Sequence, residues 1–142
     1  MAETYNKFLQ FVDDVAAKQH DFNDDLFKVA LTNNLPVNTY TVLANITQIS
    51  GTNGYTTGGE DATNLFTETG GVVTCTGTNV VWTASGGQMG PFQYVVLYND
   101  TPTTPAIDPL ICWWTRAAGA VTLEIGETFT WAPGSGNIFT LT

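Results

Sequence analysis

The residues best suited to chemistry lie near the start of the chain, where His20 precedes an acidic run. The run Asp21–Asp25 reads DFNDD and matches the opening of a calcium-binding loop, in which alternate oxygen-bearing side chains hold the ion. The rest of the loop does not match, because Leu26 stands where glycine is required and Thr32 where the bidentate glutamate belongs. We therefore expect a solvated acidic hinge here and no metal site.

His20 and the acidic pair Glu60-Asp61 do not form a recognisable catalytic group. His20 is the single histidine, and a general base needs a nucleophile or partner within hydrogen-bond reach, which the sequence does not supply. At the end of a predicted helix it is placed to interact with the helix dipole. The acidic pair is predicted to be a solvated loop tip. Without a nucleophile motif or a convincing carboxylate pair, we expect no enzyme, no catalytic residue and no cofactor.

Aromatic side chains are the other candidates for binding. Trp113 and Trp114 are adjacent in a strand-like run, so their rings must point to opposite faces. We expect one ring in the core and the other on a sheet edge or at a subunit contact. Aromatic residues are enriched at interface hot spots, so an outward ring favours a protein partner over a sugar. Core packing accounts for three of the four tryptophans, and Tyr55 lies in a glycine-rich loop.

Composition excludes several classes of partner. The chain has 142 residues, a net charge of −9 and only 12% charged residues, about half of what is typical of soluble domains. Four basic residues are too few for a phosphate-binding patch, which excludes nucleic acid and disfavours anionic membranes. No apolar run approaches the ~18 residues of a membrane span, and the N-terminus lacks the pattern of a secretory signal. Threonine, glycine and asparagine replace the missing charges.

Two cysteines lie far apart, each within an apolar run. Cys75 and Cys112 are predicted to be buried reduced thiols, with a disulfide between them as the alternative. A zinc site is disfavoured because the chain has one histidine.

The N-terminal segment has helical periodicity. Phe8, Phe11, Val12 and Val15 recur at helical spacing and predict a short amphipathic helix over 4–19, with a threonine as its N-cap. A polar break follows at 20–25. From there we divide the chain into an N-terminal helix or arm, 1–25, and a β-sandwich domain, 26–142.

After residue 25 the apolar period changes towards two, and turn residues become frequent. Strands are predicted at 26–32, 41–49, 63–69, 72–76, 79–84, 92–98, 110–115, 120–125, 128–131 and 137–141. Between 92–98 and 110–115 the link contains three prolines, which exclude a regular strand or helix. This pattern predicts a mainly β protein, an antiparallel sandwich of jelly-roll or Greek-key type with a short N-terminal α-helix. An immunoglobulin-like sandwich is the alternative.

Several segments together resemble a known group of proteins. The opening MAETYNKF and FVDDVA, then LFKVALTN, NGYTTGG, ASGGQMGPFQYVVLYNDT and PLICWW resemble small β-rich virion proteins of tailed bacteriophages. The resemblance runs over almost the whole chain, and ASGGQMGPFQYVVLYNDT is its most specific part. It implies a non-enzymatic structural component of a phage particle, located in the virion after assembly in the host cytoplasm.

The leading hypothesis is a head decoration (cement) protein that binds the phage major capsid protein or other virion proteins as a homo-oligomer. The alternatives are a tail or neck component, or a glycan-binding module of a fibre or spike. The contact residues are expected to be aromatic, and core roles remain equally open for each of them: Phe8, Phe11, Tyr55, Trp113 and Trp114. The stretch 39–49 pairs either within its own subunit or, as an exposed edge, with the sheet of a neighbouring subunit.

Overall fold

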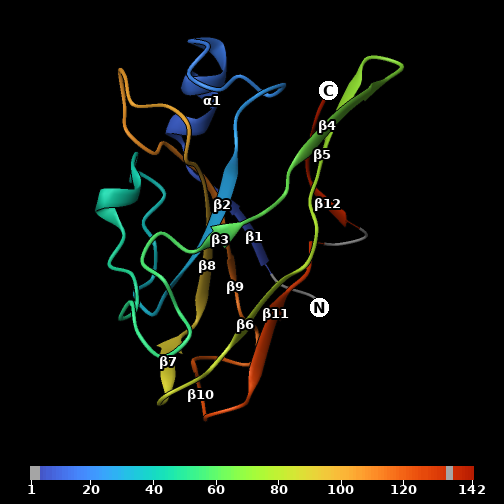
Figure 1. The fold of residues 1–142 in the computed structure, drawn as a ribbon. Helices are drawn as coiled ribbons and strands as arrows, with labels where there is room; N and C mark the ends of the chain where they lie inside the picture. The colour runs from blue at the N-terminus through green and yellow to red at the C-terminus, as the bar shows by residue number, and fades with distance from the viewer. Residues whose placement is uncertain (1–3, 134–135) are drawn as a thin grey trace.

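The chain folds as an antiparallel, sandwich-like β protein with one short α-helix (Figure 1). The computed structural model describes residues 4–133 and 136–142. The elements, in chain order, are β1 (Thr4–Lys7), α1 (Gln10–Ala16), β2 (Phe27–Thr32), the 3-10 helix η1 (Leu43–Asn45), β3 (Glu60–Asp61), β4 (Leu65–Thr69), β5 (Val72–Thr76), β6 (Val80–Thr83), β7 (Met89–Phe92), β8 (Tyr94–Asn99), β9 (Leu110–Thr115), β10 (Val121–Leu123), β11 (Thr128–Trp131) and β12 (Asn137–Leu141).

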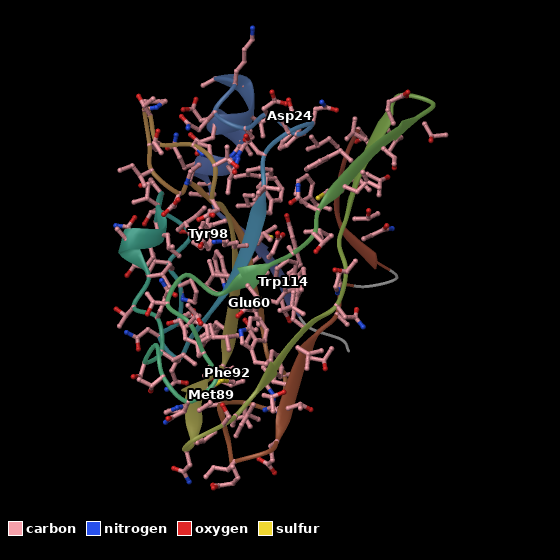
Figure 2. The ribbon with its side chains drawn as sticks, viewed as in Figure 1. Asp24, Glu60, Met89, Phe92, Tyr98 and Trp114 are labelled. Atoms are coloured by element: carbon pink, nitrogen blue, oxygen red, sulfur yellow. The ribbon has the colours of Figure 1, made fainter. Side chains whose placement is uncertain are left out.

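The main layer is a five-stranded sheet in the order β1-β9-β8-β2-β3, and its pairs are all antiparallel. Its central strand β8 is buried at every residue, which explains the unbroken apolar run in the sequence. Alternate residues of this sheet belong to two separate core clusters, one on each face. Tyr98 belongs to one cluster and Trp114 to the other, and Figure 2 shows them on opposite sides of the sheet ribbon.

The second layer consists of smaller antiparallel units, β6 with β11, β7 with β10, and β12-β5-β4. In β6 buried and exposed residues alternate, as expected for a strand with one face towards the core and one towards solvent. The buried residues Val80 and Trp82 join the same core cluster as Leu97 of the main sheet. The two layers therefore share one large core, and the expected sandwich is confirmed.

The opposite face of the main sheet is covered by the long connection between β2 and β3 (Figure 1). The predicted strand at 41–49 is wrong, because this segment contains η1 and only isolated bridges at Val42 and Gln48. The side-chain oxygen of Asn45 accepts hydrogen bonds from the backbone N–H groups of Thr41 and Val42. These bonds wind the segment into a turn, which a strand pattern does not anticipate.

The predicted helix over 4–19 is also wrong in its first half. Thr4–Lys7 forms strand β1 on the outer edge of β9, and α1 begins only at Gln10, after Leu9 as N-cap without a side-chain cap bond. Phe8 packs in one core cluster and Phe11 in the other, so the apolar stripe does not form one helical face. The N-terminal segment thus contributes a strand to the sheet of the sandwich itself.

Most other predicted strands are confirmed, four of them with the predicted bounds: 72–76, 110–115, 128–131 and 137–141. The predicted strand at 92–98 is two strands, because the chain passes at Gln93 from β7 in the second layer to β8 in the main sheet. Both cysteines are free and buried, as expected, and burial raises the pKa of the Cys75 thiol to about 12. Within the described residues, the helices are too short to cross a membrane.

Candidate binding surface

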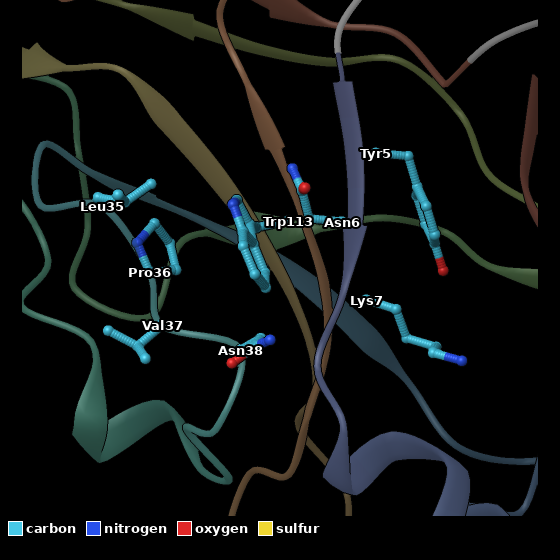
Figure 3. Close-up of a pocket in the computed structure, with 8 residues that line it drawn as sticks. All are labelled: Tyr5, Asn6, Lys7, Leu35, Pro36, Val37, Asn38 and Trp113. Carbon is cyan, nitrogen blue, oxygen red and sulfur yellow. The ribbon is translucent and has the colours of Figure 1, made fainter.

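An open groove of about 560 Å³ lies along the outer edge of β1 (Figure 3). One wall is β1 itself, with Tyr5, Asn6 and Lys7. The facing wall is the segment Leu35–Asn38, which follows β2, and Trp113 of β9 lies between the two walls. We call this feature the β1 groove. Its size falls in the range of ordinary ligand pockets.

The groove exists because β1 ends the sheet and then diverges from the segment opposite. At one end the two walls meet, where the Leu9 N–H donates to the Asn38 carbonyl at 2.9 Å. Phe8 donates its N–H to the Ile111 carbonyl at 3.1 Å, so Phe8 bonds towards β9. In an antiparallel ladder these bonds occur at every second residue. The backbone of Asn6 therefore also faces β9, and the backbone groups of the residues on either side of it face the groove.

The groove has an exposed apolar wall. Leu35 and Val37 lie close together on it and are 64% and 44% exposed. Tyr5 also lines the groove, but its ring packs against Trp114 on the opposite face of β1. Scattered apolar residues on a surface are normal, whereas a gathered group marks an interaction site.

Among the described residues, Lys7 is the single charged one that lines the groove, and its side chain lies on the face of β1 opposite Asn6 (Figure 3). Within the described residues, the one ion pair joins Lys28 and Asp100, so the exposed Lys7 ammonium is not in an ion pair there.

Trp113 is 6% exposed and packs on Phe8 with ring centroids 4.6 Å apart. Its indole Nε1 is buried and has no acceptor among the described residues.

The five aromatic residues predicted as contacts are all buried within their own chain. Phe8 and Trp113 lie together on one face of the main sheet, and Phe11 and Trp114 pack in the cluster on the other face. Opposite orientation of the two tryptophans is confirmed, but neither ring is mainly exposed. Of the five, only Trp113 lines the groove.

Tyr55 has a structural role in this chain. Its hydroxyl accepts a hydrogen bond from the Leu31 N–H at 3.1 Å and donates one to Gln48 Oε1 at 2.6 Å. Burial raises the pKa of the Tyr55 phenol to about 12, so the hydroxyl stays protonated near neutral pH. The bond from Leu31 fixes the glycine-rich loop to the C-terminal end of β2.

His20 and the acidic run occupy a buried polar cluster. The Asn99 amide nitrogen bonds both to His20 Nδ1, at 3.0 Å, and to the Asp25 carboxylate. The same carboxylate accepts the Asp21 N–H at 2.8 Å. The expected solvated hinge is therefore wrong for Asp25, which is 8% exposed, and the neighbouring His20 is 7% exposed. The described residues contain no group of three or more His, Cys, Asp or Glu side chains placed to hold a metal ion.

Two further expectations need correction. His20 does not lie at the end of α1, which stops at Ala16, and burial lowers the pKa of its imidazole. Glu60 and Asp61 are exposed, as predicted, but they form the short strand β3 against β2 and are not a loop tip.

Sequence reasoning missed the β1 groove because its walls come from a predicted helix and a predicted turn. One signal was present in the sequence, since Leu35, Pro36 and Val37 form an apolar run inside an asparagine-rich break. No family model, curated protein or solved structure matches this chain.

Proposed function

We propose that this chain is a non-enzymatic structural protein of a tailed-phage particle, which decorates the head shell. The observation that carries the proposal is the β1 groove, an exposed apolar edge on a small sandwich with little charge elsewhere. Such a domain buries apolar surface against a neighbour without much charge desolvation. The resemblance to phage virion proteins supplies the class of neighbour.

The segments that carry the resemblance also support a scaffold role. ASGGQMGPFQYVVLYNDT includes β7 and β8, and PLICWW includes most of β9. Strands β8 and β9 are the buried centre of the main sheet. The similarity therefore concerns residues that build the sandwich, which suits a protein family whose common property is a rigid fold.

The mechanism we propose is stabilisation by binding to the assembled state. A protein that contacts several capsid subunits at once binds the closed shell and not the separate subunits, so it shifts the equilibrium towards the shell. The partner is the major capsid protein, the decorating unit is a homo-oligomer, and the location is the virion surface. The acidic net charge of −9 limits adsorption to packaged DNA.

A tail or neck component is the second structural candidate, and it uses the same groove on a different neighbour. The glycan-binding alternative has lost the feature that suggested it. Sugar-stacking sites need an exposed aromatic face, whereas the four tryptophans are between 1% and 9% exposed.

Quantitative mass spectrometry of purified virions tests the proposal. We expect a copy number comparable to that of the major capsid protein. A count far below that number favours the tail or neck, and absence from the particle overturns a structural role altogether.

A binding assay then connects the location to the groove. Purified chain is added to shells that lack it, and the bound fraction is measured by sedimentation. Leu35→Glu introduces a charge on the groove wall and is expected to weaken binding at least tenfold, whereas Ile125→Glu, equally exposed but outside the groove, serves as control. Equal binding by the two variants excludes the groove as the shell-binding surface.

A further inference from the structure

We propose that the β1 groove binds an extended segment of a partner protein, which adds as an antiparallel strand to the outer edge of β1. The segment has an apolar side chain opposite Asn6, towards Trp113, and a carboxylate side chain opposite Lys7. This inference rests on the groove geometry alone and holds whatever particle or complex the chain belongs to.

The backbone of β1 provides the bonds for such a strand. The register Asn6↔Trp113, together with the Phe8 bond to Ile111, directs the N–H and C=O groups of Tyr5 and Lys7 away from β9. The sheet order places no strand beyond β1, so these groups have no partner in the described part of the chain. An added strand satisfies all four of them, which is the usual basis of recognition by strand addition.

The side chains of β1 set the pattern of the partner. Asn6 shares a sheet face with Trp113, whereas Tyr5 packs against Trp114 on the other face, with centroids 5.9 Å apart. In a paired strand, directly opposite residues share a face. The partner residue opposite Asn6 therefore lies between β1 and the apolar wall formed by Leu35 and Val37, where an aliphatic side chain buries the most area.

Charge favours a carboxylate opposite Lys7 and disfavours a second copy of the chain. Among the described residues, Lys7 is the single charged one that lines the groove, and it has no ionic partner there. If two copies paired through β1 around Asn6, Lys7 would lie opposite a tyrosine. Each copy also has a net charge of −9, so two copies repel one another at long range. A second copy would leave the Lys7 ammonium without an ionic partner, whereas a partner strand with an acidic residue opposite Lys7 forms an ion pair with it.

The size of the groove limits the paired segment to a few residues. Four residues of β1 extend over about 14 Å, and the contact between Leu9 and Asn38 closes one end. The core of the recognised motif is therefore three residues long. Read in the partner's direction, it has an acidic residue opposite Lys7 and an aliphatic residue opposite Asn6. The third residue lies opposite Tyr5, where a β-branched side chain pairs favourably with the aromatic ring.

A defined peptide tests this inference on the full chain. The probe is acetyl-Thr-Glu-Leu-Val-Thr-amide, titrated to millimolar concentration while the backbone amides are followed by NMR. We expect saturable shifts and slower hydrogen exchange at the amides of Tyr5 and Lys7, and unchanged exchange at Leu9, whose N–H already donates to Asn38. A missing response at the first two amides overturns the proposal.

Charge-reversal variants test the proposed contact with Lys7. Lys7→Glu is expected to weaken binding of the probe about threefold to fivefold, whereas Lys18→Glu, the same change at an exposed residue outside the groove, leaves it unchanged. A probe with Gln in place of Glu should lose affinity for the unmodified chain but not for Lys7→Glu. Equal weakening by both variants overturns the charge pairing.

A measurement without peptide tests for pairing between two copies. Protection of the Tyr5 and Lys7 amides at rising chain concentration identifies a second copy as the occupant and also overturns the proposal.

Discussion

The two edges of the main sheet differ in how they meet solvent. The edge at β3 is two residues long, carries two carboxylates, and follows a loop that the hydroxyls of Tyr55 and Tyr98 hold in place. The edge at β1 is twice as long and borders an apolar groove. Short, charged and covered edges are how β proteins prevent unwanted pairing. The comparison indicates that β3 is protected against new partners and that β1 is the edge available to them.

The largest effect is expected from Gly59→Ala, next to the protected edge. Gly59 has a φ of +76°, and a Cβ there would lie 1.8 Å from the Val29 carbonyl oxygen of β2. Backbone strain and the forced displacement together should lower the free energy of unfolding by about 2–6 kcal/mol in urea denaturation.

Gly126→Ala is the matched control for that substitution. Gly126 has a φ of +89°, and an added Cβ would have no atom within 4 Å. It keeps the strain without the collision and should cost about 1–2 kcal/mol. Equal losses in the two variants would mean that the approach of the loop to β2 does not hold β3 in place.

Tyr55→Phe should have the next largest effect, because it removes a buried hydroxyl from the same loop. The Leu31 N–H loses its acceptor, while Gln48 Oε1 still accepts from Gly58. A buried unsatisfied donor costs about 1–3 kcal/mol, measurable by chemical denaturation. Tyr40→Phe, at a half-buried tyrosine, is the control and should change stability by less than about 0.5 kcal/mol. If the two variants lose the same stability, the Tyr55 hydroxyl does not hold the loop.

A pair of proline substitutions tests the orientation of the open edge. Asn6→Pro removes an N–H that faces β9 and should cost about 1 kcal/mol more than Lys7→Pro, whose N–H faces the groove. Both changes constrain φ equally. The difference in thermal stability between the two variants therefore reports the contribution of the hydrogen bond from the Asn6 N–H to β9. If Lys7→Pro is the less stable variant, the hydrogen-bond alternation assigned to β1 is reversed, and strand addition to this edge fails with it.

The smallest effect concerns the buried polar cluster at the end of the sheet, away from both edges. Burial lowers the pKa of His20, so the folded state disfavours its charged form, although Asp14 and Asp25 oppose this. The neutral imidazole therefore contributes stability that is present above the unfolded pKa near 6.5 and is lost as the pH falls below it.

We expect His20→Gln to flatten the decline in unfolding free energy between about pH 7 and pH 5. The measurement is urea denaturation at several pH values in that range. An identical decline in the variant would assign the acid sensitivity to carboxylates instead.

The sequence correctly predicted those strands whose formation depends on the residues next to them in the chain. Val72–Thr76 and Thr128–Trp131 have β-rich residues bounded by turn residues, and both were located correctly. The predictions failed where contacts with other residues determine the local structure. Thr4–Lys7 becomes a strand because β9 has a free edge, and 41–49 becomes a covering loop because Asn45 caps its own turn.

For the candidate site too, residue type could be predicted from the sequence, whereas exposure could not. Aromatic residues were sensible candidates by type, yet all five are buried in this chain, and the apolar wall of the groove consists of Leu35 and Val37, which no motif marks. Exposure of Leu35 and Tyr5 depends on where the sheet ends and which loop lies opposite, and neither is a local property of the sequence.

By itself, the sequence determined the fold class, the acidic surface and the location of most strands, because periodicity and turn residues act over a few positions. Only the tertiary structure decided which strand would be the open edge, where the tryptophan rings would lie, and that His20 would be buried beside Asn99. These features depend on contacts between residues distant in the chain, and long-range packing overrides local preference wherever a sheet edge or a core needs a partner.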